Sequence, residues 1–201
     1  MIQYNFTKYI RTVYLTMILI PLTFLGCYES EYSKQVHTEM SKNINRDALI
    51  FKMKFGDTKK DFFERCWNLN KKGLVKEGPD NKFVQHILKA NKPNVNDIRM
   101  LFYGLFDEQD MMHGMNMEFS YLAYGPLNKH LTAKKLSVAV RDTIQEWFPG
   151  NQFIKLNMKL ENKEAFAKVD GNRQIVLYNR DDKDIIVKIT DLNEKDSTEL
   201  N

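Results

Sequence analysis

The feature of this chain that most restricts its fold is a series of short segments in which apolar and polar residues alternate. Leu49, Phe51, Met53 and Phe55, for example, are separated by single residues that include two lysines. A period of two predicts strands that bury one face. Residues 98–106 are instead almost continuously apolar, which is typical of a strand covered on both faces. The expected strands span residues 49–55, 83–89, 98–106, 115–123, 154–160, 165–169, 173–178 and 185–189.

Two segments have helical periodicity instead. Thr58 precedes the first and Asp61 follows three residues later, the spacing of a capping box. Thr132 precedes the second, which ends at Pro149-Gly150. The apolar face expected for the first helix comprises Phe62, Phe63, Cys66, Trp67 and Leu69. That of the second comprises Leu136, Ala139, Val140, Thr143, Ile144, Trp147 and Phe148.

Short turns connect most of the expected strands. Asp170-Gly171-Asn172 between two apolar runs indicates a hairpin, with the turn type left open. Short connections favour an antiparallel sheet. We therefore predict a single α+β domain over residues 48–192. In it, two helix-plus-β-meander units contribute two helices to one face of an antiparallel sheet.

The N-terminal residues predict where the protein is located and not how it folds. Residues 1–26 contain Lys8 and Arg11, no acidic residue, and an apolar run that ends before Gly26-Cys27. This order is typical of a signal peptide, and the run is short for a membrane span. The alternative is an ordinary signal peptide that happens to contain a cysteine.

The Phe24-Leu25-Gly26-Cys27 segment resembles the lipobox of bacterial lipoproteins, although that family prefers leucine where Phe24 stands. The resemblance implies cleavage before Cys27, acylation of its sulfur and attachment to a membrane through the lipid. Because Tyr28 rather than aspartate follows, it implies the outer membrane of the cell envelope more than the inner one. Residues 27–47 would then be a flexible tether, and residues 193–201 a polar tail.

Charge and cysteine content exclude several classes of protein. The whole chain has a net charge of +4, and the signal peptide accounts for two basic residues, which leaves +2 for the mature chain. This balance gives no reason to expect nucleic acid as a partner. The mature chain has one cysteine besides Cys27, so acylation of Cys27 excludes an intramolecular disulfide.

The order of helices and strands resembles the β-lactamase-inhibitor-protein-like fold, which occurs in tandem in that inhibitor and singly in small outer-membrane assembly lipoproteins. Phe55-Gly56-Asp57-Thr58 is similar to the entry of the first helix in those lipoproteins. The resemblance implies a binding module and carries no catalytic residues.

The sharpest candidate site is the segment 111–117, which contains four methionines and His113. Thioether and imidazole groups suit Cu(I). Met115 and Met117 are in phase with core residues, so a Cu(I) site would use Met111, Met112 and His113. Methionine is also a common core residue, which is the structural alternative.

Other polar residues indicate no reaction. The acidic groups near residues 107–110 and 181–184 lack the spacing of a calcium loop, and we interpret them as turn carboxylates. His37, His86 and His130 have no partner at ligand spacing, and Cys66 is expected in the core. We expect no enzyme and no cofactor. The sequence favours a membrane-anchored binding or assembly module for an envelope protein, peptide or glycan, with a Cu(I)-binding lipoprotein as the alternative.

Overall fold

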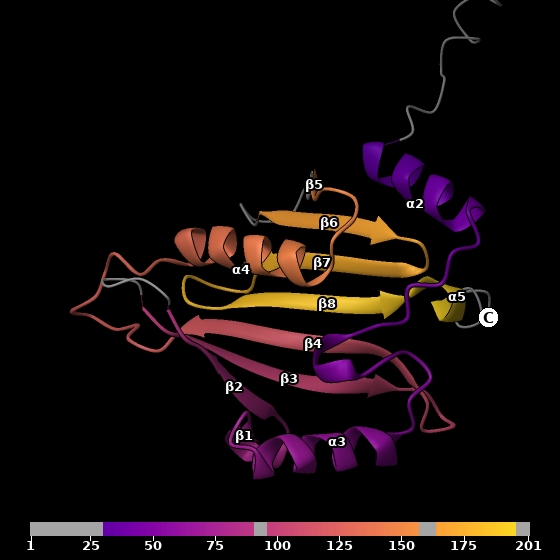
Figure 1. The fold of residues 1–201 in the computed structure, drawn as a ribbon. Helices are drawn as coiled ribbons and strands as arrows, with labels where there is room; N and C mark the ends of the chain where they lie inside the picture. The colour runs from indigo at the N-terminus through magenta and orange to yellow at the C-terminus, as the bar shows by residue number, and fades with distance from the viewer. Residues whose placement is uncertain (1–29, 91–95, 157–163, 196–201) are drawn as a thin grey trace, which may run out of the picture. The chain divides into compact units, whose positions relative to one another are not determined.

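The computed structural model describes residues 30–90, 96–156 and 164–195 (Figure 1). Its α-helices are α2 (Glu31–Ser41), α3 (Lys59–Lys71), α4 (Ala133–Trp147) and the short α5 (Leu192–Lys195). Single 3₁₀ turns are η2 (Ile50–Lys52) and η3 (Pro79–Asn81). The strands are β1 (Lys76–Glu77), β2 (Val84–Leu88), β3 (Ile98–Phe106), β4 (Met112–Tyr121), β5 (Ile154–Leu156), β6 (Ala165–Asp170), β7 (Arg173–Asn179) and β8 (Ile185–Asp191). The predicted α+β class is confirmed.

The strands form one sheet in the order β1-β2-β3-β4-β8-β7-β6-β5, and Figure 1 shows β4 beside β8 near its centre. Every pairing is antiparallel, as predicted. In the β4–β8 pair, Met117 lies opposite Val187. This pairing makes the two runs of strands one continuous sheet.

Both long helices begin where side-chain capping places them. The Thr58 hydroxyl accepts a hydrogen bond from the Asp61 backbone N–H, and the Asp61 carboxylate accepts one from Thr58. This is the predicted capping box. Thr132 accepts from the backbone N–H of Lys135 at the start of α4. Each cap satisfies a backbone donor that the first helical turn leaves unpaired.

The hairpin between β6 and β7 has a two-residue turn, because Asp170 pairs with Arg173. Gly171 has a φ of +58°, and Asn172 does not have a positive φ. Glycine at the first central position is the pattern of a type II′ turn, whose twist suits a hairpin.

One buried cluster forms the main core. Phe62 and Cys66 of α3 belong to it, together with Leu136, Val140 and Ile144 of α4. Side chains from one side of the sheet complete it, and we call that side the core face. The core-face residues in the cluster are Met100, Phe102, Met115, Met117, Phe119, Ile175, Leu177, Ile185, Val187 and Ile189.

The apolar faces predicted for the helices were partly wrong. Cys66 is buried as expected, but Phe63 and Trp67 are 58% and 61% exposed. Phe148 is buried, whereas Trp147 at the end of α4 is half-buried. Aromatic residues lie on more than one side of α3. The positions of its apolar residues therefore did not show which side is buried.

The strand predicted over 49–55 is absent. Residues 50–52 instead form the turn η2, and Ala48 and Lys54 make an isolated bridge on either side of it. Phe51 has a φ of +53°, a conformation rare for a bulky residue. Leu49, Ile50, Met53 and Phe55 are nevertheless buried. Alternation here reflects burial of a tight loop rather than an extended strand.

The tether predicted over 27–47 contains a helix, α2. Its residues belong to the same compact unit as the sheet, and α2 contacts β6 and β5. Tyr32, Val36 and Met40 recur every four residues along α2, which is the signal that could have predicted this helix. The prediction missed it because polar and charged residues outnumber these three in the segment. Of the polar tail predicted over 193–201, residues 193–195 lie in α5, and the rest lies outside the described residues.

Candidate functional site

The side of the sheet opposite the core face, which we call the open face, carries the most unusual surface of this domain. Successive strand residues point to opposite faces, so the sequence neighbours of core-face residues lie here. The open-face residues considered below are Tyr103, Leu105, Asn116, Glu118, Val176, Tyr178, Ile186 and Lys188. Lys188 is exposed and the others are half-buried. Other residues of this face, among them Leu101, Ala167 and Val169, are buried, and Gln174 donates a hydrogen bond to the Tyr32 hydroxyl of α2. The open face is therefore open in part, and there the apolar and aromatic side chains are unusual, because a solvated sheet face normally alternates to polar residues.

The polar groups of the open face are organised by contacts with one another. Asn116 Nδ2 donates to the Tyr103 hydroxyl at 2.6 Å. Arg180 makes two hydrogen bonds to the Glu118 carboxylate, and it also pairs with Asp184. The hydrogen bonds to Glu118 raise the pKa of Arg180. A fixed ion pair beside aromatic and apolar side chains provides both hydrogen bonds and apolar contact to a partner.

A second feature is an apolar hollow of about 420 Å³. It is lined by Leu49, Ile50, Phe51, His86, Leu88, Trp147 and Phe148. The Phe51 and His86 rings meet edge to face at 5.2 Å. His86 Nδ1 lies 2.6 Å from the Leu74 carbonyl oxygen, so Nδ1 carries the proton. The hollow therefore offers mainly apolar contact.

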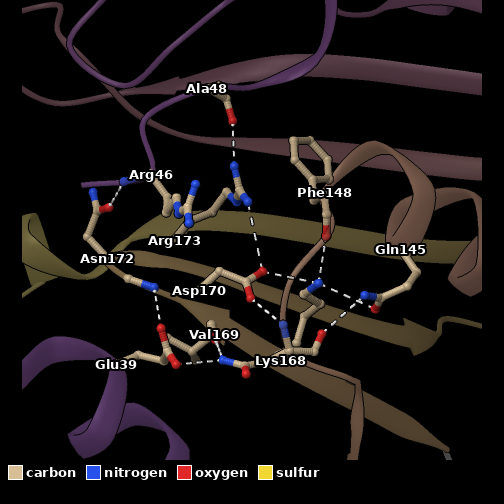
Figure 2. A network of polar contacts seen from close by, with 12 residues as sticks. Glu39, Arg46, Ala48, Gln145, Phe148, Lys168, Val169, Asp170, Asn172 and Arg173 are labelled. Atoms are coloured by element: carbon tan, nitrogen blue, oxygen red, sulfur yellow. Dashed lines mark hydrogen bonds and ion pairs between the residues drawn. The ribbon is translucent and has the colours of Figure 1, made fainter. Parts of the chain in front are cut away.

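A buried ion network ties the β6–β7 hairpin to the rest of the domain (Figure 2). Lys168 is 0% exposed. Its Nζ donates to the Phe148 carbonyl at 2.6 Å and lies 3.1 Å from Asp170 Oδ2. Burial lowers the pKa of Lys168, and Asp170 opposes that shift. The ammonium group is committed to partners inside the protein and is not available as a nucleophile.

Arg173 extends the network to the N-terminal part of the domain. Its Nη1 donates to the Ala48 carbonyl at 3.0 Å, and its guanidinium lies 4.6 Å from the centre of the Phe148 ring. Asp170 lies between the two cations and also accepts from the Asn151 backbone N–H at 2.7 Å. A Cβ at Gly150 would stand 2.2 Å from Asp170 Oδ1. This close approach requires glycine.

Helix α2 contacts the same hairpin from the side of the open face, where Tyr32 accepts a hydrogen bond from Gln174. Glu39 accepts hydrogen bonds from the Gly171 backbone N–H at 2.9 Å and from Asn151 Nδ2 at 2.7 Å. Burial alone would raise the pKa of Glu39, but these bonds and Lys42 outweigh burial and lower it. Gln35 accepts from the backbone N–H of Val169, which lies beyond the β5 pairing. α2 therefore covers backbone groups at the edge of β6.

The three predicted copper ligands lie in different surroundings. A bulge inserts one residue into β4 opposite Leu105 and Phe106. As a result Met112 is 1% exposed, with its sulfur beside Gly104 in the core. Met111 is 36% exposed and His113 is half-buried. Within residues 30–90, 96–156 and 164–195, no three His, Cys, Asp or Glu side chains are placed to hold a metal ion.

The remaining candidates have structural surroundings. Asp107 accepts from the backbone N–H groups of Gln109 and Met111, and Asp181 from those of Lys183 and Asp184. These contacts confirm the interpretation as turn carboxylates for Asp107 and Asp181. Asp184 is instead buried and pairs with Arg180. Burial raises the pKa of the Cys66 thiol to about 12, so this sulfur stays protonated at neutral pH.

Cys27 lies outside the described residues. Where the structure is described, no helix has both the length and the apolar character needed to cross a bilayer. No protein-family model, curated protein or solved structure matches the chain.

Sequence reasoning missed the open face and the ion network. Lys168 follows Phe166 by two residues in an alternating strand, and both are therefore on the same face of β6. A lysine in phase with a core residue is the signal that predicts a buried cation. The open face has no comparable signal, because its members come from four strands whose order is not readable from the sequence.

The ion network predicts a specific pattern of stability loss. We expect Lys168→Met to lower the free energy of unfolding by about 3–5 kcal/mol, because it leaves Asp170 buried with weaker compensation. The double variant with Asp170→Asn should lose less than the sum of the single variants, since the two residues interact. Urea unfolding measures these values. Lys188→Met, an exposed lysine on β8, is the matched control and should change stability by less than about 0.5 kcal/mol. Additive losses would contradict the network.

Glu39 predicts how acid acts on the domain. Because its pKa is lower in the folded than in the unfolded protein, its contribution is present above the ordinary value of 4.5. That contribution is lost as the pH falls through the lowered folded value. Glu39→Gln should therefore destabilise the protein at neutral pH, and the difference from wild type should shrink below about pH 4.5. Unfolding curves across pH measure it, with the exposed Glu146→Gln as control. A difference independent of pH would show that the Glu39 charge is unimportant.

Proposed function

We propose that this protein is a lipid-anchored envelope protein that acts as a non-enzymatic binding or assembly module. The open face would receive a protein, peptide or glycan partner. The observation that carries this proposal is the set of half-buried apolar and aromatic side chains on that face. Tyrosine is enriched where proteins bind partners, and contiguous apolar surface is uncommon on free domains. The Arg180–Glu118 pair adds a polar group with fixed geometry.

The proposed architecture is two helix-plus-β-meander units with α3 and α4 over the same face of the sheet. Support comes from Phe62 of α3, which contacts the core-face residue Phe102, and from the contacts of α4 with β4, β7 and β8. The mirrored strand order, with β4 and β8 adjacent, also favours it. The resemblance to the β-lactamase-inhibitor-protein-like fold is part of this proposal and rests on the same element order.

The proposed location is the cell envelope, with acylated Cys27 as the membrane anchor. The outer membrane is favoured over the inner one. This location rests on the Gly26-Cys27 junction after the apolar run. More than one acyl chain is needed for stable attachment, and the lipoprotein resemblance implies two or three. A non-enzymatic role fits the buried state of Lys168 and Cys66. We propose no copper function. Met112 is buried in the core, which leaves Met111 and His113 as two of the three predicted ligands.

The anchor is tested by metabolic labelling with a fatty-acid analogue. We expect label on the wild-type protein and on Cys66→Ser, and none on Cys27→Ser. The Cys66 variant is the control because it removes the other cysteine of the chain. Equal labelling of the Cys27 and Cys66 variants would contradict acylation at Cys27 and leave the binding proposal untouched.

The binding proposal is tested by site-specific photocrosslinking in intact cells. A photoreactive phenylalanine at Tyr178 should give a discrete adduct, and the same group at Val138 should not. Val138 is 48% exposed on α4 and serves as the matched control. Lys188 lies on β8, next to the strand that carries Tyr178. The substitution Lys188→Glu should weaken the adduct if the open face recognises its partner. The proposal fails if position 178 gives no adduct, or only the adducts seen from position 138.

A further inference from the structure

The outer side of α3 carries an exposed stripe that the proposed binding role does not use. Lys60, Phe63, Trp67 and Lys71 follow one another at spacings of three, four and four residues, which places them along one side of the helix. We call them the α3 stripe. Phe63 and Trp67 are more than half exposed, and Leu74 just beyond the helix is 47% exposed. Isolated exposed apolar residues are ordinary, but a cluster of this kind indicates a contact surface.

The stripe lies in the most basic part of the domain. Residues 58–76 contain six basic and two acidic residues, a net charge of +4, which equals the charge of the entire chain. Arg65 is turned toward the neighbouring loop, where it donates to the Lys52 carbonyl. Lys60, Lys71, Lys72 and Lys76 are exposed and have no ion-pair partner among the described residues. Lys60 and Lys71, at the two ends of the stripe, are therefore among the cations without such a partner.

We propose that the α3 stripe docks on an anionic lipid surface, with Phe63 and Trp67 at the level of the headgroups. Helices that lie in a membrane interface insert Trp and Phe at the boundary of the headgroups and carry Lys or Arg on their polar face. Lysine stems extend along apolar surface while their ammonium groups reach the headgroups. Lys71 is already placed for this, with its Nζ 5.2 Å from the centre of the Trp67 ring.

The composition of the stripe favours a membrane over a protein partner. Protein interfaces are enriched in arginine and depleted in lysine, yet every exposed cation around this stripe is lysine. Lysines near an anionic leaflet each add attraction. The inference goes beyond the proposed function, because it needs neither acylation of Cys27 nor a partner on the open face.

The two tryptophans of the chain make the test direct. In the full-length Trp147→Phe variant, Trp67 is the one tryptophan whose fluorescence is measured. In the full-length Trp67→Phe variant, it is Trp147. Both are mixed with vesicles rich in brominated phosphatidylglycerol and with brominated phosphatidylcholine vesicles. We expect strong quenching of Trp67 by the anionic vesicles, severalfold weaker in high salt. Half-buried Trp147 should be quenched little in either.

Charge variants in the Trp147→Phe background identify the surface involved. Lys71→Glu should reduce quenching of Trp67 severalfold, whereas Lys188→Glu, an equal charge change on β8, should not. Equal quenching of Trp67 and Trp147, or equal effects of the two substitutions, would overturn the proposal. So would a blue shift of Trp67 that grows with protein concentration without quenching, because the stripe would then be a contact between copies. Fatty-acid labelling of Cys27 reports on the anchor separately.

Discussion

The buried network of Lys168, Asp170 and Arg173 is the interaction on which the arrangement of this domain most depends. It joins the β6–β7 hairpin to the Phe148 carbonyl after α4 and to the Ala48 carbonyl before η2 (Figure 2). Two cations and one carboxylate are costly to remove from water unless their hydrogen bonds are satisfied. The segments that supply the partners must therefore be in place together. This coupling fixes the positions of chain segments that are far apart in sequence.

Local signals predicted the elements whose structure depends on neighbouring residues. Residues 98–106 form β3 with the predicted bounds, and Thr58 with Asp61 makes the predicted capping box. Helix caps and hairpin turns are formed by residues within four or five positions of one another. They can therefore be predicted from a single sequence. The antiparallel sheet followed from the short turns, but the adjacency of β4 and β8 did not. That pairing joins strands separated by α4 and three other strands.

The wrong predictions share a dependence on distant contacts. Phe51 lies in a turn of positive φ because its ring packs against His86 and Phe102. α2 is held by Glu39, whose partners stand more than a hundred residues away, at Gly171 and Asn151. The exposure of Trp67 follows from the choice of Phe62 and Cys66 as the buried side of α3. The apolar pattern within residues 49–55 and within α3 does not reveal these choices, and in α2 three apolar residues at spacing four are the one local signal.

The core face determines where the two proposed surfaces can lie. α3 packs through Phe62 on Phe102, so its outer stripe is directed away from the sheet on that side. Tyr178 and the other open-face residues belong to the opposite side. The two surfaces share no residue. Helix α2 covers the β6 side of the open face, so a domain resting on lipid through Trp67 would leave the part around Tyr178 and Lys188 for a partner. The two proposed contacts would then be compatible. Membrane contact would then restrict the orientation of the open face as well as its distance from the bilayer.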